Sequence, residues 1–421
     1  MTTAPTPKSD FLRTVMARGQ FHQCSDLEGL DAALGRPGLT GYIGFDMTAR
    51  SLHVGNLAQI MYLRRLQQAG GRPIVLLGGG TTRIGDPSGK DESRQLLSES
   101  DIEANKDSIR KTFDKFLTFG DGPADAIMAD NADWLMGLNY ISFLRDVGRH
   151  MSVNRMLTMD SVKLRLEREH PLSFIEFNYM VLQAYDFVEL HRRYKCRLQM
   201  GGSDQWGNII NGVELGRRME GAELMALTQP LITTASGAKM GKTAEGAVWL
   251  NADMRSPYDY WQFWRNTEDA DVGRFMRIFT DLPEAEIAAY EQAEGRAINE
   301  AKKRLADEAT ALLHGPEEAK QARSAAEAVF DAGGVGEGMP TIEVARAKLV
   351  AGYGVIDALV DAGLAESRSE AKRAISKDKS VKLNGEAVTD EALVIRETEL
   401  DSDGAARLSV GRKRHARLKA V

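Results

Sequence analysis

Cysteines and long apolar runs are scarce in this sequence, and each shortage excludes a class of protein. Two cysteines in 421 residues, Cys24 and Cys196, cannot form a disulfide framework, so we expect a reducing, cytoplasmic setting. The sequence has no CxxC pair or Cys/His cluster, which argues against a structural zinc site. The longest apolar runs, such as residues 73–77, are far shorter than the ~20 residues that cross a bilayer. We therefore expect neither a membrane span nor a secretory signal.

An excess of basic charge is missing as well. The 54 lysines and arginines are outnumbered by 60 aspartates and glutamates, which gives a net charge of −6. This balance argues against a protein that coats nucleic acid without specificity, although an acidic chain can still contain a basic module. The length of the chain suggests roughly three domains of ordinary globular composition.

Strand-like and helix-like segments alternate in the first half of the chain. Residues 41–45 and 72–77 have the composition of short buried strands, and residues 57–69 and 174–190 have the helical period. Alternation of this kind predicts an α/β fold. We expect a Rossmann-like catalytic domain, with a parallel sheet covered on both faces, over residues 1–246.

The second half of the chain has a different composition. Residues 283–332 are dense in Ala, Glu, Lys and Arg without a strand pattern, which predicts an α-helical domain over residues 247–332. Four glycines and a proline in residues 333–340 indicate a linker, which we extend over residues 333–352. A small α+β unit over residues 353–421 would follow.

The glycine-rich stretch at residues 78–90 does not fit the standard phosphate-binding motifs. A Walker A loop would need glycine at Ile84, and a dinucleotide fingerprint would need glycine at Arg83. Asp86 adds a carboxylate to the site that this loop would line. A tight turn after a strand is the alternative that composition leaves open.

The segment around His53 combines a strand end, a polar loop and a helix start near Val54. Helix N-termini present N–H groups and a positive dipole end, which favours phosphate binding. His53 and Asn56 lie three residues apart and face the same side of the first turn, and Gly55 between them leaves room for a flat ring. A capping role for these residues remains the alternative.

Two lysines and a hydroxyl residue follow on a loop rich in Gly and Ser. Lys239, Lys242 and Thr243 could close over a triphosphate and stabilise the charge on departing pyrophosphate. A solvated turn is the alternative explanation.

A third group of polar residues lies on one predicted helix. Tyr179, Gln183 and Asp186 have the spacing i, i+4 and i+7, which places them on one face and indicates a pocket with polar groups. Residues 201–205 form a second glycine-rich turn at a strand end, where ligands bind in open parallel sheets. The polar helix face could instead hydrogen-bond to a neighbouring strand.

Together these segments resemble the class I aminoacyl-tRNA synthetases, and among them the bacterial-type tyrosyl-tRNA synthetases. His53–Asn56 is similar to the HIGH signature and Lys239–Thr243 to the KMSKS signature, in the same order along the chain. The similarity extends from about residue 8 to 421. Four local stretches match at length: residues 42–57, 84–90, 177–186 and 198–208.

The resemblance implies roles for the matching residues in binding tyrosine. Tyr42 and Asp186 would bind the phenol hydroxyl. A second set would hold the other end of the amino acid, at its α-ammonium group and its carboxylate: Asp86, Tyr179, Gln183 and Gln205.

The resemblance also implies the residues that bind ATP. The adenosine would be bordered by Gly44, Asp46, Gly202 and Asp204, with Asp204 on the ribose. Gly55 would also belong to the ATP site. The groups at the phosphates and the leaving pyrophosphate would be Thr48, His53, Asn56, Lys239, Lys242 and Thr243. Asn56 replaces the second histidine of the signature and Met47 replaces a frequent proline. Because Asn56 keeps a neutral amide donor, we expect activity to be retained.

The C-terminal unit resembles the small RNA-binding domain of ribosomal protein S-four. Residues 360–375 have a helix–turn–helix pattern with Arg368, Lys372 and Arg373, and residues 381–386 form a strand with an Asn-Gly turn. Residues 407–421 contain six lysines and arginines, one histidine and no acidic residue. A basic surface of this kind would contact tRNA phosphates, and a solvated charged tail is the alternative.

The implied reaction is activation of L-tyrosine with ATP to tyrosyl-adenylate, followed by transfer to the 3′-terminal adenosine of tRNA(Tyr). ATP would be a substrate, as its magnesium complex, without a tightly bound cofactor or a protein-held metal. No covalent enzyme intermediate is needed, which agrees with the lack of a nucleophile–base arrangement. The resemblance also implies a homodimer, with residues 130–156 at the interface.

Three alternatives from other classes remain open. A tryptophanyl enzyme shares the fold and the signatures, but Tyr42 with Asp186 favours a phenol over an indole. A nucleotidylyltransferase can use a similar helix start, but it would not need the C-terminal module. A non-catalytic RNA-binding protein on a synthetase scaffold would not need Lys239 and Lys242.

Overall fold

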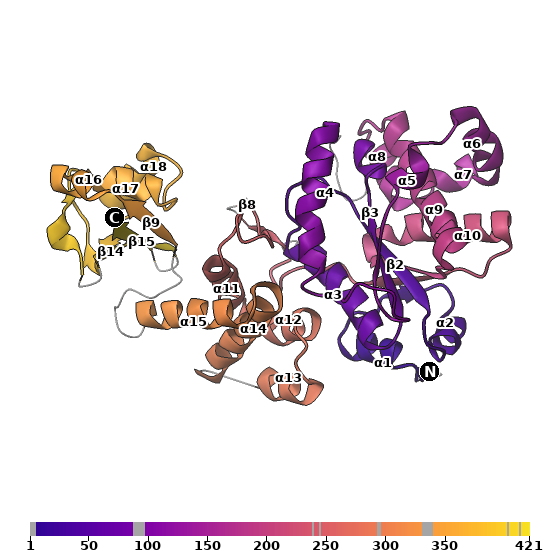
Figure 1. The fold of residues 1–421 in the computed structure, drawn as a ribbon, viewed down its shortest axis with the longest axis horizontal. Coiled ribbons are helices and arrows are strands. Elements are labelled where there is room, and N and C mark those ends of the chain that lie inside the picture. The colour runs from indigo at the N-terminus through magenta and orange to yellow at the C-terminus, as the bar shows by residue number, and fades with distance from the viewer. Residues whose placement is uncertain are drawn as a thin grey trace. The chain divides into compact units, whose positions relative to one another are not determined.

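The computed structural model describes residues 6–86, 97–237, 240–243, 246–292, 296–330, 340–401, 404–411 and 414–421 (Figure 1). The chain divides into two compact units. The first contains residues 1–251 and 268–291, and the second contains residues 252–267 and 292–421. We describe each unit by itself.

A six-stranded sheet forms the centre of the first unit, in the order β1-β6-β5-β2-β3-β4. The neighbouring strands are parallel, except that β1 pairs antiparallel with β6 at one edge. The strands are β1 (Gln23–Cys24), β2 (Thr40–Phe45), β3 (Arg72–Leu77), β4 (Ile127–Asp130), β5 (Leu198–Gly202) and β6 (Met225–Gln229). The predicted parallel-sheet α/β fold is confirmed, and both strands predicted at residues 41–45 and 72–77 are present.

The strand order has a switch point between β2 and β5. From β2 the chain proceeds outward through β3 to β4, whereas β5 and β6 extend in the opposite direction. Strand β2 pairs with β5 only at Gly41 and Tyr42, near the start of β2. The carboxyl ends of β2 and β5 therefore diverge, and ligands bind outside such a point in open α/β sheets.

Helices cover both faces of this sheet. Tyr42 and Leu76 belong to a core with Phe187 of the long helix α9 (Phe174–Tyr194), and the ring centroids of Tyr42 and Phe187 lie 5.2 Å apart, edge to face. On the opposite face Gly41 lies against Leu66 of helix α3 (Val54–Gln68). The apolar strands of such a sheet are buried on both sides, which explains the continuous apolar runs in the sequence.

The helices of the first unit include two that begin with complete caps. Helix α3 begins after His53, and helix α9 begins with a capping box between Ser173 and Glu176. The helices are α1 (Asp10–Ala17), α2 (Leu27–Leu34), α3 (Val54–Gln68), α4 (Glu99–Phe113), α5 (Ala132–Leu135), α6 (Tyr140–Asp146), α7 (Val153–Met156), α8 (Asp160–Glu167), α9 (Phe174–Tyr194), α10 (Trp206–Glu220), α12 (Val272–Phe279) and α13 (Glu284–Glu291).

The second unit begins with helices that pack on one another. Helix α11 (Pro257–Arg265) packs against α14 (Arg296–His314) and α15 (Pro316–Phe330). Trp261 donates from Nε1 to Asp307 at 2.8 Å, and Asp307 also accepts from Arg323 at 2.7 Å. Helices α12 and α13 lie within the predicted helical domain of residues 247–332 but group with the first unit.

The C-terminal part of the second unit is an α+β fold with a five-stranded sheet in the order β12-β11-β14-β15-β9. In the predicted hairpin, Asn384 and Gly385 both have positive φ, as a two-residue turn requires. Its elements are β9 (Thr341–Val344), α16 (Arg346–Ala351), β10 (Tyr353–Gly354), α17 (Val355–Asp361), α18 (Arg368–Ser376), β11 (Val381–Leu383), β12 (Glu386–Ala387), β13 (Val394–Ile395), β14 (Ala405–Val410) and β15 (Arg414–Ala420).

The linker predicted at residues 333–352 is wrong in its second half. Strand β9 and helix α16 lie there, and β9 pairs in parallel with β15. The pairing takes place between segments about seventy residues apart, so local composition does not reveal it. In the described part of the chain, no helix is long and apolar enough to cross a membrane.

Candidate active site

A cavity of about 410 Å³ opens at the switch point of the first unit's sheet. Most of the residues singled out in the sequence line it, although they come from segments far apart in the chain. These residues are Tyr42, Gly44, Asp46, Thr48, His53, Gly55, Asn56, Asp86, Gln183, Asp186, Gly202, Asp204 and Gln205.

Asp186 lies at the deepest end of the cavity. It is 2% exposed, and its carboxylate accepts hydrogen bonds from Asn131 Nδ2 at 2.9 Å and Trp134 Nε1 at 2.8 Å. Burial nevertheless raises the pKa of Asp186 to about 7. The two donors partly offset this effect, because they stabilise the charged form.

Tyr42 belongs to the same end of the cavity. Its hydroxyl is buried, and no described protein group hydrogen-bonds to it. Burial, with a smaller contribution from Asp186, raises the pKa of Tyr42 above its ordinary value. An unsatisfied buried hydroxyl beside a buried carboxyl group is costly, and a polar group of a ligand could satisfy both.

Asn131 and Trp134 hold the Asp186 carboxylate in place, and the sequence did not reveal either of them. They directly follow β4, a four-residue strand that the apolar pattern did not predict. Their hydrogen bonds to Asp186 cross 55 and 52 residues of sequence. A polar Asp-Asn pair after a strand would have been the only local signal.

The middle of the cavity contains a second group of carboxylates. Tyr179 donates to Asp46 at 3.3 Å, and Thr81 donates to the same carboxylate at 3.1 Å. Gln205 Nε2 donates to Asp86 at 3.0 Å. Asp46, which the resemblance placed beside the nucleoside, is therefore also next to Tyr179.

Three amides connect the predicted helix face with the second glycine-rich turn. Gln183 donates to Gln205 Oε1 at 3.4 Å, and Asn208 Nδ2 donates to Gln183 at 3.1 Å and to Gln205 at 3.2 Å. Each amide orients the next one. The polar face of α9 thus points into the cavity.

The first turn of α3 forms the opposite end of the cavity. His53 Nδ1 accepts from the Gly55 backbone N–H at 3.0 Å, and Asn56 Oδ1 accepts from the His53 N–H at 3.1 Å. The capping role considered from the sequence is therefore present. With Nδ1 accepting, neutral His53 carries its proton on Nε2, and the Asn56 amide keeps its N–H donors, so capping is compatible with anion binding.

Gly55 lines the cavity, and the space into which a side chain at this position would project is filled. A Cβ at this position would lie 2.7 Å from the His53 ring and 3.1 Å from the Met240 carbonyl oxygen. The space beside Gly55 is therefore occupied by the protein itself. Glycine is needed there because the His53 ring and the loop around Met240 approach the helix closely.

The lysine-bearing loop reaches this turn through its backbone. The Met240 N–H donates to the Ile232 carbonyl oxygen at 3.0 Å. Gly241 has φ of +84°, and a Cβ at this position would lie 2.7 Å from the Gly55 nitrogen. Lys239 lies outside the described residues, and only the backbone of Lys242 and Thr243 is described, as strand β7 (Lys242–Thr243) paired with β8 (Gly246–Ala247). The assigned roles of these three side chains stay predictions.

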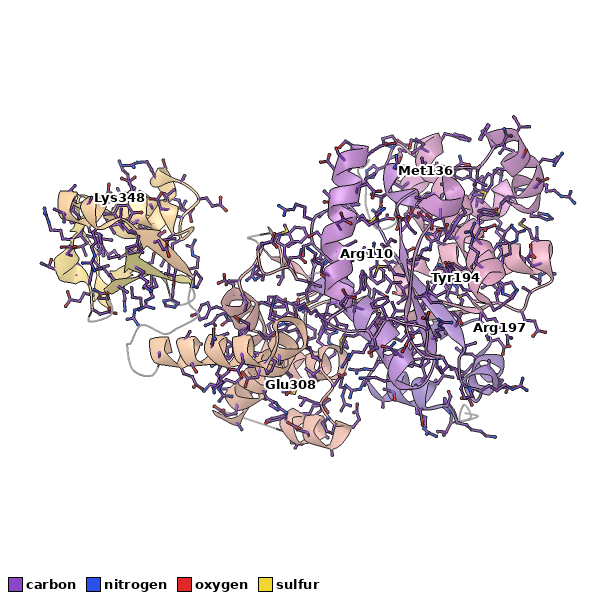
Figure 2. All side chains as sticks on the ribbon, viewed as in Figure 1. Arg110, Met136, Tyr194, Arg197, Glu308 and Lys348 are labelled. Carbon is purple, nitrogen blue, oxygen red and sulfur yellow. The ribbon has the colours of Figure 1, made fainter. Side chains whose placement is uncertain are left out.

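A second cavity, of about 500 Å³, lies at the amino ends of β3 and β4. Arg72, Arg110, Asp121 and Tyr194 line it, and Figure 2 labels Arg110 and Tyr194. None of the residues singled out in the sequence belongs to it, and the amino ends of parallel strands are not where ligands bind. Among the described residues, no group of three or more His, Cys, Asp or Glu side chains could hold a metal ion.

Comparisons with known proteins match both the N-terminal and the C-terminal part of the chain to families. The family model "tRNA synthetases class I (W and Y)" matches residues 36–331, and the model "Tyrosine--tRNA ligase SYY-like C-terminal domain" matches residues 332–416. A protein of Nitrobacter winogradskyi named tyrosine–tRNA ligase is 60% identical over 98% of this chain and 99% of its own length. One from a Caulobacter species with the same name is 58% identical over the full length of both chains.

Solved structures show the same fold. A C-terminally truncated mitochondrial tyrosyl-tRNA synthetase of Aspergillus nidulans has a TM-score of 0.68 and 30% identity, covering 77% of this chain and 94% of that one. The tryptophanyl-tRNA synthetase of Plasmodium falciparum, at a TM-score of 0.53 and 14% identity over 73% of this chain and 84% of that one, shares the fold alone. Because the family model matches most of the chain and a relative is 60% identical over 98% of it, the chain belongs to the class I tRNA synthetases of the W and Y family.

Proposed function

We propose that this protein is a tyrosine–tRNA ligase, which activates L-tyrosine with ATP and transfers it to the 3′-terminal adenosine of tRNA(Tyr). Relatives about 60% identical over the whole chain have this name. The observation that carries the proposal within the structure is the buried end of the cavity, where both the Asp186 carboxylate and the unsatisfied Tyr42 hydroxyl belong to the lining.

The buried end fits a phenol better than a plain aromatic ring. The substrate hydroxyl would donate to Asp186 and accept from Tyr42. Phenylalanine would leave both groups unpaired in a dry pocket, and this cost gives discrimination. An indole N–H could donate to Asp186 but has no acceptor for Tyr42, so the same pair disfavours tryptophan.

The carboxylates in the middle of the cavity suit the α-ammonium group of the amino acid. Asp86 and Tyr179 would hold it together with Gln183, and Gln205 would lie near its carboxylate. The amide connections among α9, Gln205 and Asn208 fix these side chains before the substrate arrives, which limits the entropy lost on binding.

The far end of the cavity suits the ATP phosphates. Thr48, His53 and Asn56 would contact them at the first turn of α3, and Lys239, Lys242 and Thr243 would stabilise the departing pyrophosphate. Gly44, Asp46, Gly202 and Asp204 would border the adenosine. The tyrosine carboxylate attacks the α-phosphorus, so positioning and charge stabilisation supply the rate. Magnesium would arrive bound to the ATP phosphates.

A second copy of the chain is the expected partner of the first unit. Ten of the fourteen large apolar side chains that are exposed in the described residues lie between residues 136 and 175, including Ile141 at 71% and Phe174 at 70% exposure. Met136, labelled in Figure 2, is another. Apolar surface of this extent indicates an interface, and a homodimer would cover it, with residues 130–156 contributing as predicted.

The C-terminal residues would bind tRNA. Helix α18 carries Arg368, Lys372 and Arg373, and Arg407 lies opposite Arg417 on strands β14 and β15. An RNA phosphate would be attracted to both guanidinium groups. In this proposal residues 1–246 perform the chemistry, while residues 247–332 and 353–421 contact the tRNA, in the cytoplasm.

The test is amino-acid-dependent ATP–pyrophosphate exchange by the purified protein, with tyrosine, tryptophan and phenylalanine assayed in parallel. Exchange with tyrosine alone is the expected result. Exchange with tryptophan would transfer the assignment to the tryptophanyl enzymes. Absence of exchange in folded protein that still binds tRNA would support the non-catalytic alternative.

A further inference from the structure

One ion pair of the first unit holds residues 233–235, which precede Met240 in the lysine-bearing loop. We call this segment the loop limb. The Asp271 carboxylate, 1% exposed, accepts from the Ala235 backbone N–H at 2.7 Å and from Arg274 Nη2 at 2.6 Å. Arg274 also donates to the Thr233 carbonyl oxygen. The Thr233 carbonyl oxygen and the Ala235 N–H are thus both held by the pair of Asp271 and Arg274.

The position of Asp271 makes this contact unusual. Asp271 is the N-cap residue of α12, where an aspartate ordinarily bonds the first N–H groups of its own helix. Its side chain makes no such capping bond, and one of its oxygens accepts from the loop instead. The Asp271 carboxylate therefore bonds to the loop and to Arg274 rather than to its own helix.

The loop limb is connected, through Met240 and Gly241, to the first turn of α3, which we call the catalytic turn. The Met240 N–H bonds to Ile232, the residue before Thr233, so the limb and the returning chain are joined at their base. The next residue, Gly241, packs against the Gly55 nitrogen and the His53 ring. A shift of the limb would therefore change how the loop meets the phosphate end of the cavity.

Helix α12 is itself fixed to α3, the helix that begins at His53. At its far end Asp281 accepts from Arg64 at 2.6 Å and also pairs with Arg65, both on α3. Arg18 donates to the Arg277 carbonyl at 2.8 Å and to the Thr280 carbonyl at 3.0 Å. The loop limb and the catalytic turn are thereby attached to one rigid frame.

We propose that Asp271 and Arg274 are positioning residues for the activation step. Their ion pair sets the limb at residues 233–235, and through it the placement of Met240 and Gly241 against the first turn of α3. The inference rests on the proposed function, because it assigns the loop to the pyrophosphate of that reaction. The lysine charges that are expected to stabilise the departing pyrophosphate would then be held in a fixed place, without reorganisation during the reaction.

The experiment compares two arginines on the same helix in the full-length protein. Arg274→Ala releases the loop limb, whereas Arg277→Ala, one turn further along, removes ion pairs to Glu284 and Glu291 without touching the loop. In tyrosine-dependent pyrophosphate exchange, we expect Arg274→Ala to lower kcat about 10-fold and Asp271→Ala about 10- to 100-fold. The KM for tyrosine should stay within about twofold, because the limb is remote from Asp186.

Rescue by a conservative change separates positioning from simple stability. Asp271→Asn keeps an oxygen for the Ala235 N–H but loses the charge that holds Arg274, so its kcat should lie between those of the wild type and Asp271→Ala. Arg277→Ala should keep kcat within about twofold even where it lowers Tm. If Asp271→Ala fails to fold, the kcat of Arg274→Ala is the deciding measurement, because Arg274 is half-exposed and its replacement disturbs the core less.

Three results would overturn the inference alone. They are equal losses of kcat in Arg274→Ala and Arg277→Ala, a loss that appears mainly in the KM for tyrosine, and an unchanged kcat in Arg274→Ala. Absence of tyrosine-dependent exchange by the unmutated protein would instead overturn the proposed function, and this inference with it.

Discussion

The pH dependence of tyrosine binding offers a direct test of the buried end of the cavity. Burial raises the pKa of Asp186 to about 7, and the phenol hydroxyl is expected to donate to the ionised form. The ligand must then bind the fraction of protein in which Asp186 is deprotonated. At pH 6 that fraction is about one tenth, so tyrosine should bind about tenfold more weakly than at pH 8.

Removing a donor to Asp186 should move this dependence in a known direction. Trp134→Phe deletes the indole N–H that bonds the carboxylate at 2.8 Å. A hydrogen bond to a charged group contributes about 1.5–3 kcal/mol, which is equivalent to about one to two pKa units. The carboxylate is less stable without that bond, so the midpoint of the binding profile should rise by about one unit or more.

Equilibrium binding of tyrosine between pH 5.5 and 8.5, without ATP, measures both effects. Phenylalanine is the matched control, because it has no hydroxyl to donate to Asp186 and its weak binding should not follow the same profile. Tyrosine affinity that is constant over this range, or a midpoint that falls in Trp134→Phe, would refute the reasoning.

The same group should influence stability with the opposite sign. A carboxyl group whose folded pKa is raised holds its proton in the folded protein between its ordinary pKa and pH 7, where the unfolded chain has lost it. Its contribution to stability is therefore greatest at low pH and is lost as the pH rises to about 7. Asp186→Asn should raise Tm at pH 8 relative to the wild type while it abolishes tyrosine selectivity.

Three further predictions concern other parts of the chain. His53→Ala should lower the kcat of pyrophosphate exchange while tyrosine affinity stays unchanged. Because α3 loses its N-cap, the variant should also lose about 1 kcal/mol of unfolding free energy in urea. A parallel loss of tyrosine affinity would contradict this prediction. Deletion of residues 340–421 should spare exchange and abolish tRNA charging, whereas a cut at residue 353 would leave β9 without its partner β15; loss of exchange in the folded deletion would show that the module is structural. Ile141→Asp should shift a dimer to a monomer in sedimentation, with an exposed polar position such as Arg145→Ala as the control, and an unchanged sedimentation coefficient would reject the interface.

How much the sequence could predict depended on the range of the interactions. Strands β2 and β3 are continuous apolar runs, and α9 has a clear helical period, so local pattern was sufficient for them. Strand β4 has four residues and β1 has two, too few for a pattern to be distinguished from a loop. Helix α9 placed Tyr179, Gln183 and Asp186 correctly on one face because periodicity alone determines that placement.

The parts of the site that escaped prediction depend on contacts between distant segments. Trp134 and Asn131 acquire a role only once β4 lies beside β3 and the chain after it reaches Asp186. Gly55 was expected to accommodate a ligand ring, and no local pattern indicated that the Met240 carbonyl, nearly two hundred residues later, also lies close to it. Local spacing cannot reveal such approaches.

The charges around the cavity predict that tyrosine and ATP assist each other's binding. Four aspartates line it (Asp46, Asp86, Asp186 and Asp204), and among its described lining residues there is no lysine or arginine. These carboxylates repel an entering triphosphate, in opposition to the attraction expected from Lys239 and Lys242. The ammonium group of bound tyrosine would neutralise part of the carboxylate charge. Binding of a non-hydrolysable ATP analogue should therefore be about fivefold or more tighter with tyrosine present, and by linkage tyrosine should gain the same factor from the analogue. The control is 3-(4-hydroxyphenyl)propionate, which keeps the phenol and lacks the ammonium group. If this compound strengthens binding of the analogue as much as tyrosine does, electrostatic neutralisation is not the cause of the coupling.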